Sequence, residues 1–94
     1  MLAITRFSVP DDAAADFEKG ARELLDLLAA QPGYVTGRLS RAVDDPSVWA
    51  LVTEWEGAGF YRRSMSPYEV RIAAMTLMSR AIDEAGAFEV LHQR

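Results

Sequence analysis

The sequence contains no cysteine and a single histidine, His92. Because thiols are absent, no disulfide can form, and the usual zinc and iron–sulfur ligand sets are excluded. No apolar run approaches the roughly 18–20 residues that a membrane-spanning helix needs. Residues 1–12 also lack the basic region and the long apolar stretch of a signal peptide. We therefore expect a soluble, cytoplasmic protein without a metal site.

Glycine-rich phosphate-binding motifs are also absent. The chain has neither a G-x-G-x-x-G sequence nor a P-loop, so a nucleotide-binding role has no support. There is no G-x-S-x-G sequence that would supply a nucleophilic serine for His92. Ten basic residues stand against fourteen acidic ones, and the net charge of −4 disfavours nucleic acid or an anionic membrane as the main partner. The basic residues do not cluster, apart from the pair Arg62-Arg63.

Apolar residues, in contrast, make up half of the 94-residue chain. A chain of this length forms one domain, residues 1–94, and buries only about 60–65% of its unfolded surface. Its stability as a monomer is therefore marginal. Since no disulfide is available, association is the main way to bury more apolar surface. We predict a homodimer, with two-fold symmetry as the simplest arrangement.

The first part of the chain predicts a strand followed by a helix. Residues 2–9 alternate as a strand does, with Leu2 and Ile4 on one face and Ala3, Phe7 and Val9 on the other. Pro10 ends the strand, and Asp11 or Asp12 is expected to cap the next helix. An apolar stripe at helical spacing indicates this helix; it consists of Phe17, Ala21, Leu24, Leu25 and Leu28. The segment Gln31 to Gly33 ends it.

Residues 34–43 and 48–56 predict two strands joined by a turn at 44–47, and thus a hairpin. In the later strand one face carries Trp49, Leu51, Thr53 and Trp55, and the other carries Val48, Ala50, Val52, Glu54 and Glu56. Both faces are substantially apolar, although a sheet covered by helices on one side needs only one apolar face. We interpret the second apolar face as the dimer surface.

The last third predicts another helix and a final strand. The glycines at 57 and 59 break the preceding strand, and residues 60–65 form one short helical turn or an irregular loop. Ser66, Pro67 and Glu69 have the spacing of a capping box, which predicts a helix start. One face of this helix carries Val70, Ala73, Ala74, Leu77, Met78 and Ala81, and a flanking stripe carries Tyr68, Ile72 and Met75. Residues 87–92 read as a short strand.

The resulting order, βαββαβ, predicts an α+β protein: a ferredoxin-like sandwich with a four-stranded antiparallel sheet and two helices on one face. The open face is apolar, and we expect it to meet a second copy of the chain.

Three segments make the chain resemble the antibiotic biosynthesis monooxygenase family of small dimeric α+β barrel proteins. These segments are PGYVTGRL at 32–39, VWALVTEWE at 48–56 and AFEVL at 87–91. The resemblance covers nearly the whole chain. It implies the dimeric α+β barrel fold and, for different branches of the family, either cofactor-independent oxygenation of polyphenolic or quinol substrates or the degradation of haem.

The haem branch of the family is disfavoured by two missing residues. That branch uses a histidine of the second helix as the axial ligand and an asparagine of the first strand. Met75 stands in the corresponding helix region, and the sequence contains no asparagine; its first strand offers Thr5, Arg6 and Phe7 instead.

The monooxygenase branch implies a site without metal or flavin, because an electron-rich aromatic substrate donates an electron to oxygen once it is deprotonated. The protein then has to hold the ring, favour its anion and exclude water. The family places a tryptophan at the end of the third strand, and Trp55 matches it. By position we predict Tyr61, Arg62 and Tyr68 as polar catalytic contacts, with a pocket lined by Trp49, Met65, Ile72 and Met75.

Structural roles remain open for each of these residues. Both tryptophans and the methionines fit a hydrophobic core, the arginine pair fits a solvated surface, and Tyr68 fits packing against the sheet or a dimer mate. The rival functions are accordingly a non-catalytic dimer that binds a small hydrophobic ligand, and a cofactor-free isomerase or decarboxylase on the same scaffold.

Overall fold

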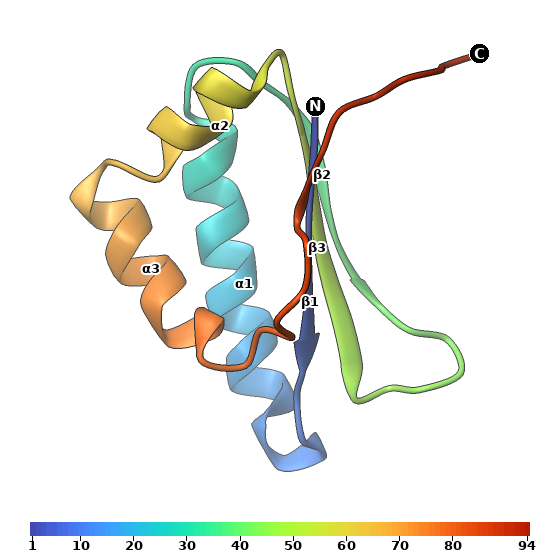
Figure 1. Ribbon diagram of the computed structural model, residues 1–94. Coiled ribbons are helices and arrows are strands. Elements are labelled where there is room, and N and C mark those ends of the chain that lie inside the picture. Colours follow the sequence, from blue (N-terminus) through green and yellow to red (C-terminus); the bar gives the residue numbers. More distant parts are fainter.

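The computed structural model describes residues 1–94 and contains one antiparallel sheet covered by helices on one face (Figure 1). In chain order the elements are β1 (Leu2–Ser8), the 3₁₀ turn η1 (Asp11–Ala13), α1 (Ala14–Ala29), β2 (Tyr34–Arg41), β3 (Val48–Trp55), α2 (Ala58–Ser64), α3 (Tyr68–Met78) and β4 (Ala87–Phe88). The predicted βαββαβ order is confirmed. Of the two alternatives for residues 60–65, the helical one is confirmed, since this segment lies largely in a third, shorter helix, α2. No helix combines the length and the apolar character that crossing a membrane requires.

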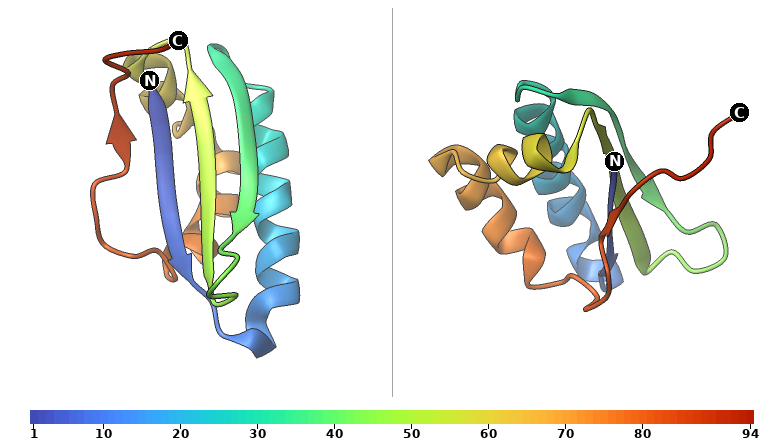
Figure 2. Two further views of the ribbon diagram at one scale, coloured as in Figure 1. Left: turned by 90° about the vertical axis from the view of Figure 1, so that its right-hand side faces the viewer. Right: turned by 45° about the horizontal axis from the view of Figure 1, so that its top comes forward.

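The strands lie in the order β2-β3-β1-β4, so β3 and β1 form the centre of the sheet (Figure 2). All pairs are antiparallel; in the central pair Ala3 stands opposite Thr53 and Phe7 opposite Trp49. This is the ferredoxin-like topology. The helices cover one face, and the other face has no covering element (Figure 1).

The core lies between the sheet and the helices, and it follows the strand alternation of β3. All four residues from Trp49 to Trp55 that point toward the helices are buried, while those that point away are partly exposed. The ring of Phe17 in α1 lies 5.0 Å from that of Phe7 and 5.4 Å from that of Trp49. Burial of a side chain of this size contributes about 1.5–3 kcal/mol, so these contacts fix α1 against the sheet.

Gly33 lies in the short turn that connects α1 to β2. Its φ of 83° lies in the left-handed region, which favours glycine. The ring of Phe60 occupies the space into which a side chain at this position would project.

The predicted helix caps are wrong in detail. Asp11 and Asp12 lie within η1, so α1 begins only after Ala13, and no side chain caps it. At α3 the N-cap is Pro67, and the hydroxyl of Ser66 makes no cap hydrogen bond. Since the backbone N–H of Ser66 donates to the carbonyl of Arg63, Ser66 still belongs to the closing turn of α2.

The free edge of β1 explains why the last elements are shorter than predicted. The N–H of Ser8 donates to Arg80 and the N–H of Ile82 donates to Arg6, so the chain after α3 pairs with this edge first. The helix therefore ends at Met78 and does not reach Ala81, which forms an isolated bridge with Phe7.

The predicted strand at 87–92 is likewise confirmed only for Ala87–Phe88, which pair with β1. Beyond them the chain leaves the sheet and runs outward on its uncovered side (Figure 1). The side chains of Val90 and His92 are exposed there.

Candidate active site

An apolar cavity of about 270 Å³ lies between the sheet and the helices. Its walls come from β1, α1, β3, α2 and α3. The lining residues are Ala3, Thr5, Phe7, Leu24, Leu28, Leu51, Thr53, Tyr61, Met65, Ala74 and Met78. Ligand pockets are mostly apolar hollows with a few placed polar groups and volumes from about 300 Å³ upward. This cavity has the same character and lies just below that range, so only a small ligand would fit.

Three hydroxyl groups are the polar side-chain groups of this lining, and they come from different elements. Thr5 belongs to β1, Thr53 to β3 and Tyr61 to α2. None of them is a base at neutral pH, so the cavity offers hydrogen bonds and no proton acceptor of the strength of a carboxylate or an imidazole.

The hydroxyl of Thr53 is held by a tryptophan. The indole Nε1–H of Trp55 donates to Thr53 Oγ1 at 2.8 Å, and both side chains are buried. Trp55 itself is 1% exposed and does not line the cavity. Its ring is enclosed by the rings of Tyr34, at 5.5 Å, and Tyr61, at 5.9 Å.

Tyr61 is the titratable residue of the cavity. Burial raises the pKa of its phenol above the ordinary value of 10.0. The group is therefore protonated at neutral pH and acts as a hydrogen-bond donor. Its position in α2 is supported by Ser64, whose hydroxyl donates to the Tyr61 carbonyl at 2.6 Å.

A second hollow of about 470 Å³ adjoins the cavity and shares Thr5, Tyr61 and Met78 with it. Because these three residues line both spaces, they form the boundary between them. The second hollow is bordered by the segment after α3, including Glu84, which pairs with Arg6 at 3.3 Å. We predict that a ligand enters the cavity from this side.

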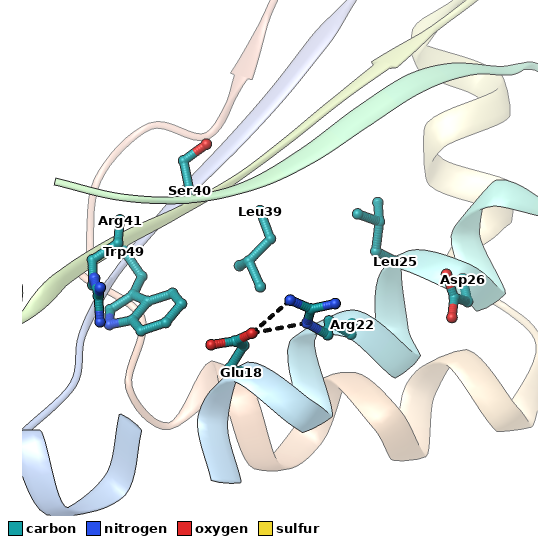
Figure 3. A pocket seen from close by; sticks show the side chains of 8 residues that line it. All are labelled: Glu18, Arg22, Leu25, Asp26, Leu39, Ser40, Arg41 and Trp49. Carbon is teal, nitrogen blue, oxygen red and sulfur yellow. Dashed lines mark hydrogen bonds and ion pairs between the residues drawn. The ribbon is translucent and has the colours of Figure 1, made fainter. Parts of the chain in front are cut away.

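A wider groove of about 530 Å³ runs between α1 and β2 (Figure 3). Glu18 and Arg22, one turn apart on α1, form an ion pair of 2.7 Å along one wall, and the guanidinium of Arg41 lies 5.2 Å from the centre of the Trp49 ring. Trp49 Nε1 is buried without a hydrogen-bond partner. Acidic and basic groups alternate along this exposed surface, so it lacks the enclosed apolar walls of the smaller cavity, which we take as the candidate site.

The structure brings only part of the predicted site together. Tyr61 and Met65 line the cavity, and Trp55 lies directly behind Thr53. Trp49 borders the groove between α1 and β2 instead.

The other predicted residues point away from the cavity. They are Arg62, which is exposed on α2, and three residues of α3 with exposed fractions of 70% for Tyr68, 46% for Ile72 and 66% for Met75. Ile72 borders a separate hollow between α1 and α3.

Thr5 and Thr53 are site residues that the sequence analysis did not select. Strand alternation places both on the face that carries the core, and polar residues on a buried face point to a hydrogen-bonding role. That signal was available for Thr53, which shares its face with Trp49 and Trp55.

No group of three or more His, Asp or Glu side chains is placed to hold a metal ion.

The family model for antibiotic biosynthesis monooxygenases matches residues 1–65 of the chain. The chain belongs to the antibiotic biosynthesis monooxygenase family. The match covers β1 to α2, including Thr5, Thr53, Trp55 and Tyr61. Tyr68, Ile72 and Met75 lie beyond it.

Solved structures extend the likeness over the rest of the chain. SnoaB from Streptomyces nogalater, described as a cofactor-independent oxygenase, is 25% identical in a mutant form; the match covers 98% of this chain and 93% of that one, with a TM-score of 0.86. A Nitrosomonas europaea protein, whose name assigns it to the same monooxygenase family, is 16% identical and has a TM-score of 0.81 over 97% of this chain and 98% of that one. The second likeness concerns the fold alone.

A relative in Streptomyces coelicolor, named as a 42.8 kDa protein in the whiE locus, is 31% identical over 55 residues. This match covers 58% of the chain but only 14% of that relative's length.

Proposed function

We propose that this protein is a cofactor-independent monooxygenase that oxidises a small phenolic substrate, of the quinol or polyketide kind, in the cavity between sheet and helices. The observation that carries the proposal is the apolar cavity lined by three hydroxyl-bearing residues, within a chain of the monooxygenase family. The 25% identity with a cofactor-independent oxygenase over 98% of the chain supports it.

The reaction needs no external reductant. A phenol with a hydrogen at the para ring carbon reacts with one O₂ to give a para-quinone and one water. One oxygen atom forms the new C=O bond, while the other leaves as water with the hydrogens of the broken C–H and O–H bonds. The four electrons that reduce O₂ come from the phenol itself.

The cavity favours this chemistry in two ways. Its apolar walls exclude water, which strengthens every electrostatic interaction inside. Tyr61, protonated at neutral pH, donates a hydrogen bond to the substrate oxyanion, which is the form that gives an electron to oxygen. Since the lining has no carboxylate or imidazole, the substrate enters as its phenolate or loses its proton to solvent. An isomerase or decarboxylase that depends on a general base has correspondingly less support.

Arg62 and Tyr68 remain predicted contacts. Because their side chains are exposed, they would act at the rim of the site or in a partner protomer.

We also infer a homodimer formed through the open face of the sheet, as the family membership supports. Its apolar residues are partly exposed in the single chain: Leu2, Ile4, Val48, Ala50 and Val52. Covering them would bury the second apolar face that the alternation of β3 creates.

The experiment that tests the proposal measures oxygen uptake by chelator-treated protein with a panel of phenols that includes 1-naphthol. We expect one O₂ consumed per quinone formed and, with ¹⁸O₂, one labelled atom in the product. The Tyr61→Phe variant tests the role of the phenolic hydroxyl and should turn over more slowly. Tight binding of the phenols without any uptake above the uncatalysed rate would instead establish the non-catalytic ligand-binding dimer.

A further inference from the structure

We infer that Thr53 is a specificity-determining hydrogen-bond donor of the cavity, oriented by Trp55, and that the site therefore selects ligands with an acceptor oxygen over hydrocarbons of the same shape. The inference concerns the site on which the proposed function rests, and it specifies the ligand class: aromatic ketones, quinones and phenolates.

The indole Nε1–H of Trp55 donates a hydrogen bond to Thr53 Oγ1 at 2.8 Å. An indole N–H is a donor only, whereas a hydroxyl has one donor and two acceptor sites. The indole therefore occupies an acceptor site of Thr53, and the hydroxyl hydrogen cannot point toward Trp55. In an isolated threonine the hydroxyl turns freely; here the indole occupies one acceptor site and directs the hydroxyl hydrogen away from Trp55.

No group of the protein accepts this hydrogen. Thr53 takes part in a single side-chain hydrogen bond, as the acceptor, although it is only 3% exposed. Its methyl group faces Gly37 of the neighbouring strand, where an added Cβ would lie 3.1 Å from Thr53 Cγ2. The side chain lines the cavity, so the cavity is where the hydroxyl finds a partner. A buried donor without an acceptor is costly, and a ligand oxygen placed there removes that cost.

Thr5 differs from Thr53 because no donor orients its hydroxyl. It lines the same cavity but is partly exposed, and no side chain donates to its hydroxyl. Its hydroxyl can rotate and also borders the outer hollow. We therefore assign the directed donor to Thr53, with Trp55 as its positioning residue.

The test uses two ligands that differ by one carbonyl group, 1-tetralone and tetralin, titrated against the whole protein without oxygen. In Thr53→Val the affinity for 1-tetralone should fall about 2- to 12-fold, the range expected for one neutral hydrogen bond, while the affinity for tetralin stays within about twofold. Thr53→Ser should restore the preference for the ketone. Thr36→Val, at an exposed threonine of β2 that does not line the cavity, should change it by less than about twofold.

Two measurements separate positioning by Trp55 from a merely structural role. The indole N–H resonance of Trp55 in a ¹⁵N-correlated spectrum should move in Thr53→Val, because its acceptor is lost. In Trp55→Phe the preference for 1-tetralone over tetralin should decrease, because the indole no longer directs the Thr53 hydroxyl hydrogen away from itself.

Equal losses of affinity for both ligands in Thr53→Val, or no loss for either, would overturn the inference, as would failure of the unmodified protein to bind 1-tetralone. These outcomes are independent of turnover. A protein that prefers 1-tetralone but consumes no oxygen refutes the proposed monooxygenase and leaves the role of Thr53 standing.

Discussion

Replacing Ala74 with leucine should narrow the cavity enough to block ligand binding without unfolding the protein. Ala74 lies in α3, and its side chain lines the cavity of about 270 Å³. Leucine adds three carbon atoms, and its helix propensity is close to that of alanine. At about 0.8 kcal/mol per buried CH₂ group, the additional burial stabilises the folded state by up to about 2.4 kcal/mol. Overpacking where the branch meets Leu24 or Leu28 would cost about 1–3 kcal/mol, so we expect the free energy of unfolding to change by no more than about 2 kcal/mol.

The neighbouring residue supplies the matched control. Ala73 is also a partly buried alanine of α3, but it borders the hollow between α1 and α3 instead of the cavity. Urea denaturation would give the stability of both leucine variants, and titration with 1-tetralone and oxygen uptake with 1-naphthol would give their function. Ala73→Leu should retain both activities within about twofold, while Ala74→Leu should lose them. A folded Ala74→Leu variant with the affinity and the turnover of the unmodified protein would refute the assignment of the site to this cavity.

Three further predictions follow from the same structure. Because burial raises the pKa of Tyr61 above 10.0, the folded chain holds this proton more tightly than the unfolded chain, and the contribution to stability is constant below pH 10 and lost as the pH rises further. Tyr61→Phe should therefore shift the midpoint of alkaline unfolding upward while lowering kcat by about 10²-fold; an unchanged midpoint would contradict the burial argument. Val52→Asp, at the centre of the open sheet face, should give a monomer in sedimentation velocity, and a persistent dimer would place the interface elsewhere. Met78→Ala should widen the boundary between cavity and outer hollow and raise kcat/KM for tricyclic relative to bicyclic phenols, whereas an unchanged ratio would argue against entry on this side.

The fold was predictable because its determinants are local and periodic. The alternation from Trp49 to Trp55 assigns one face of β3 to the core, and the structure confirms each assignment. The predictions that were wrong concern features that depend on contacts between distant parts of the chain. Arg80 and Ile82 pair with the free edge of β1 across more than seventy residues, and no local pattern at 79–82 indicates that the helix must end there.

The site was less predictable for a related reason. The family resemblance predicts Trp55 as a site residue at the end of a strand, but its burial depends on Tyr34 and Tyr61, which come from other elements. Tyr68, Ile72 and Met75 follow helical spacing, yet the rotation of α3 about its axis, set by packing against α1, turns them outward. Periodicity identifies a stripe on a helix without saying which of two adjacent stripes faces the core.

A cavity without a general base changes what the protein must contribute to catalysis. If the substrate brings both the electrons and an ionised oxygen, the protein has to supply shape, dryness and donors for that oxygen, and the donors available are Tyr61, Thr53 and Thr5. A site with the same shape, dryness and donors also binds an aromatic ketone that cannot react. On this scaffold, a catalyst and a binding protein would therefore differ in the ligand that they hold more than in the residues that line the cavity. Tyr61 and Thr53 would both interact with a phenolate, but only its reaction with O₂ requires the charge to be released from that oxygen, so donors that bind the anion too strongly would slow the reaction. The neutral hydroxyls of this site, in place of a buried arginine, are consistent with holding the phenolate while leaving it able to react.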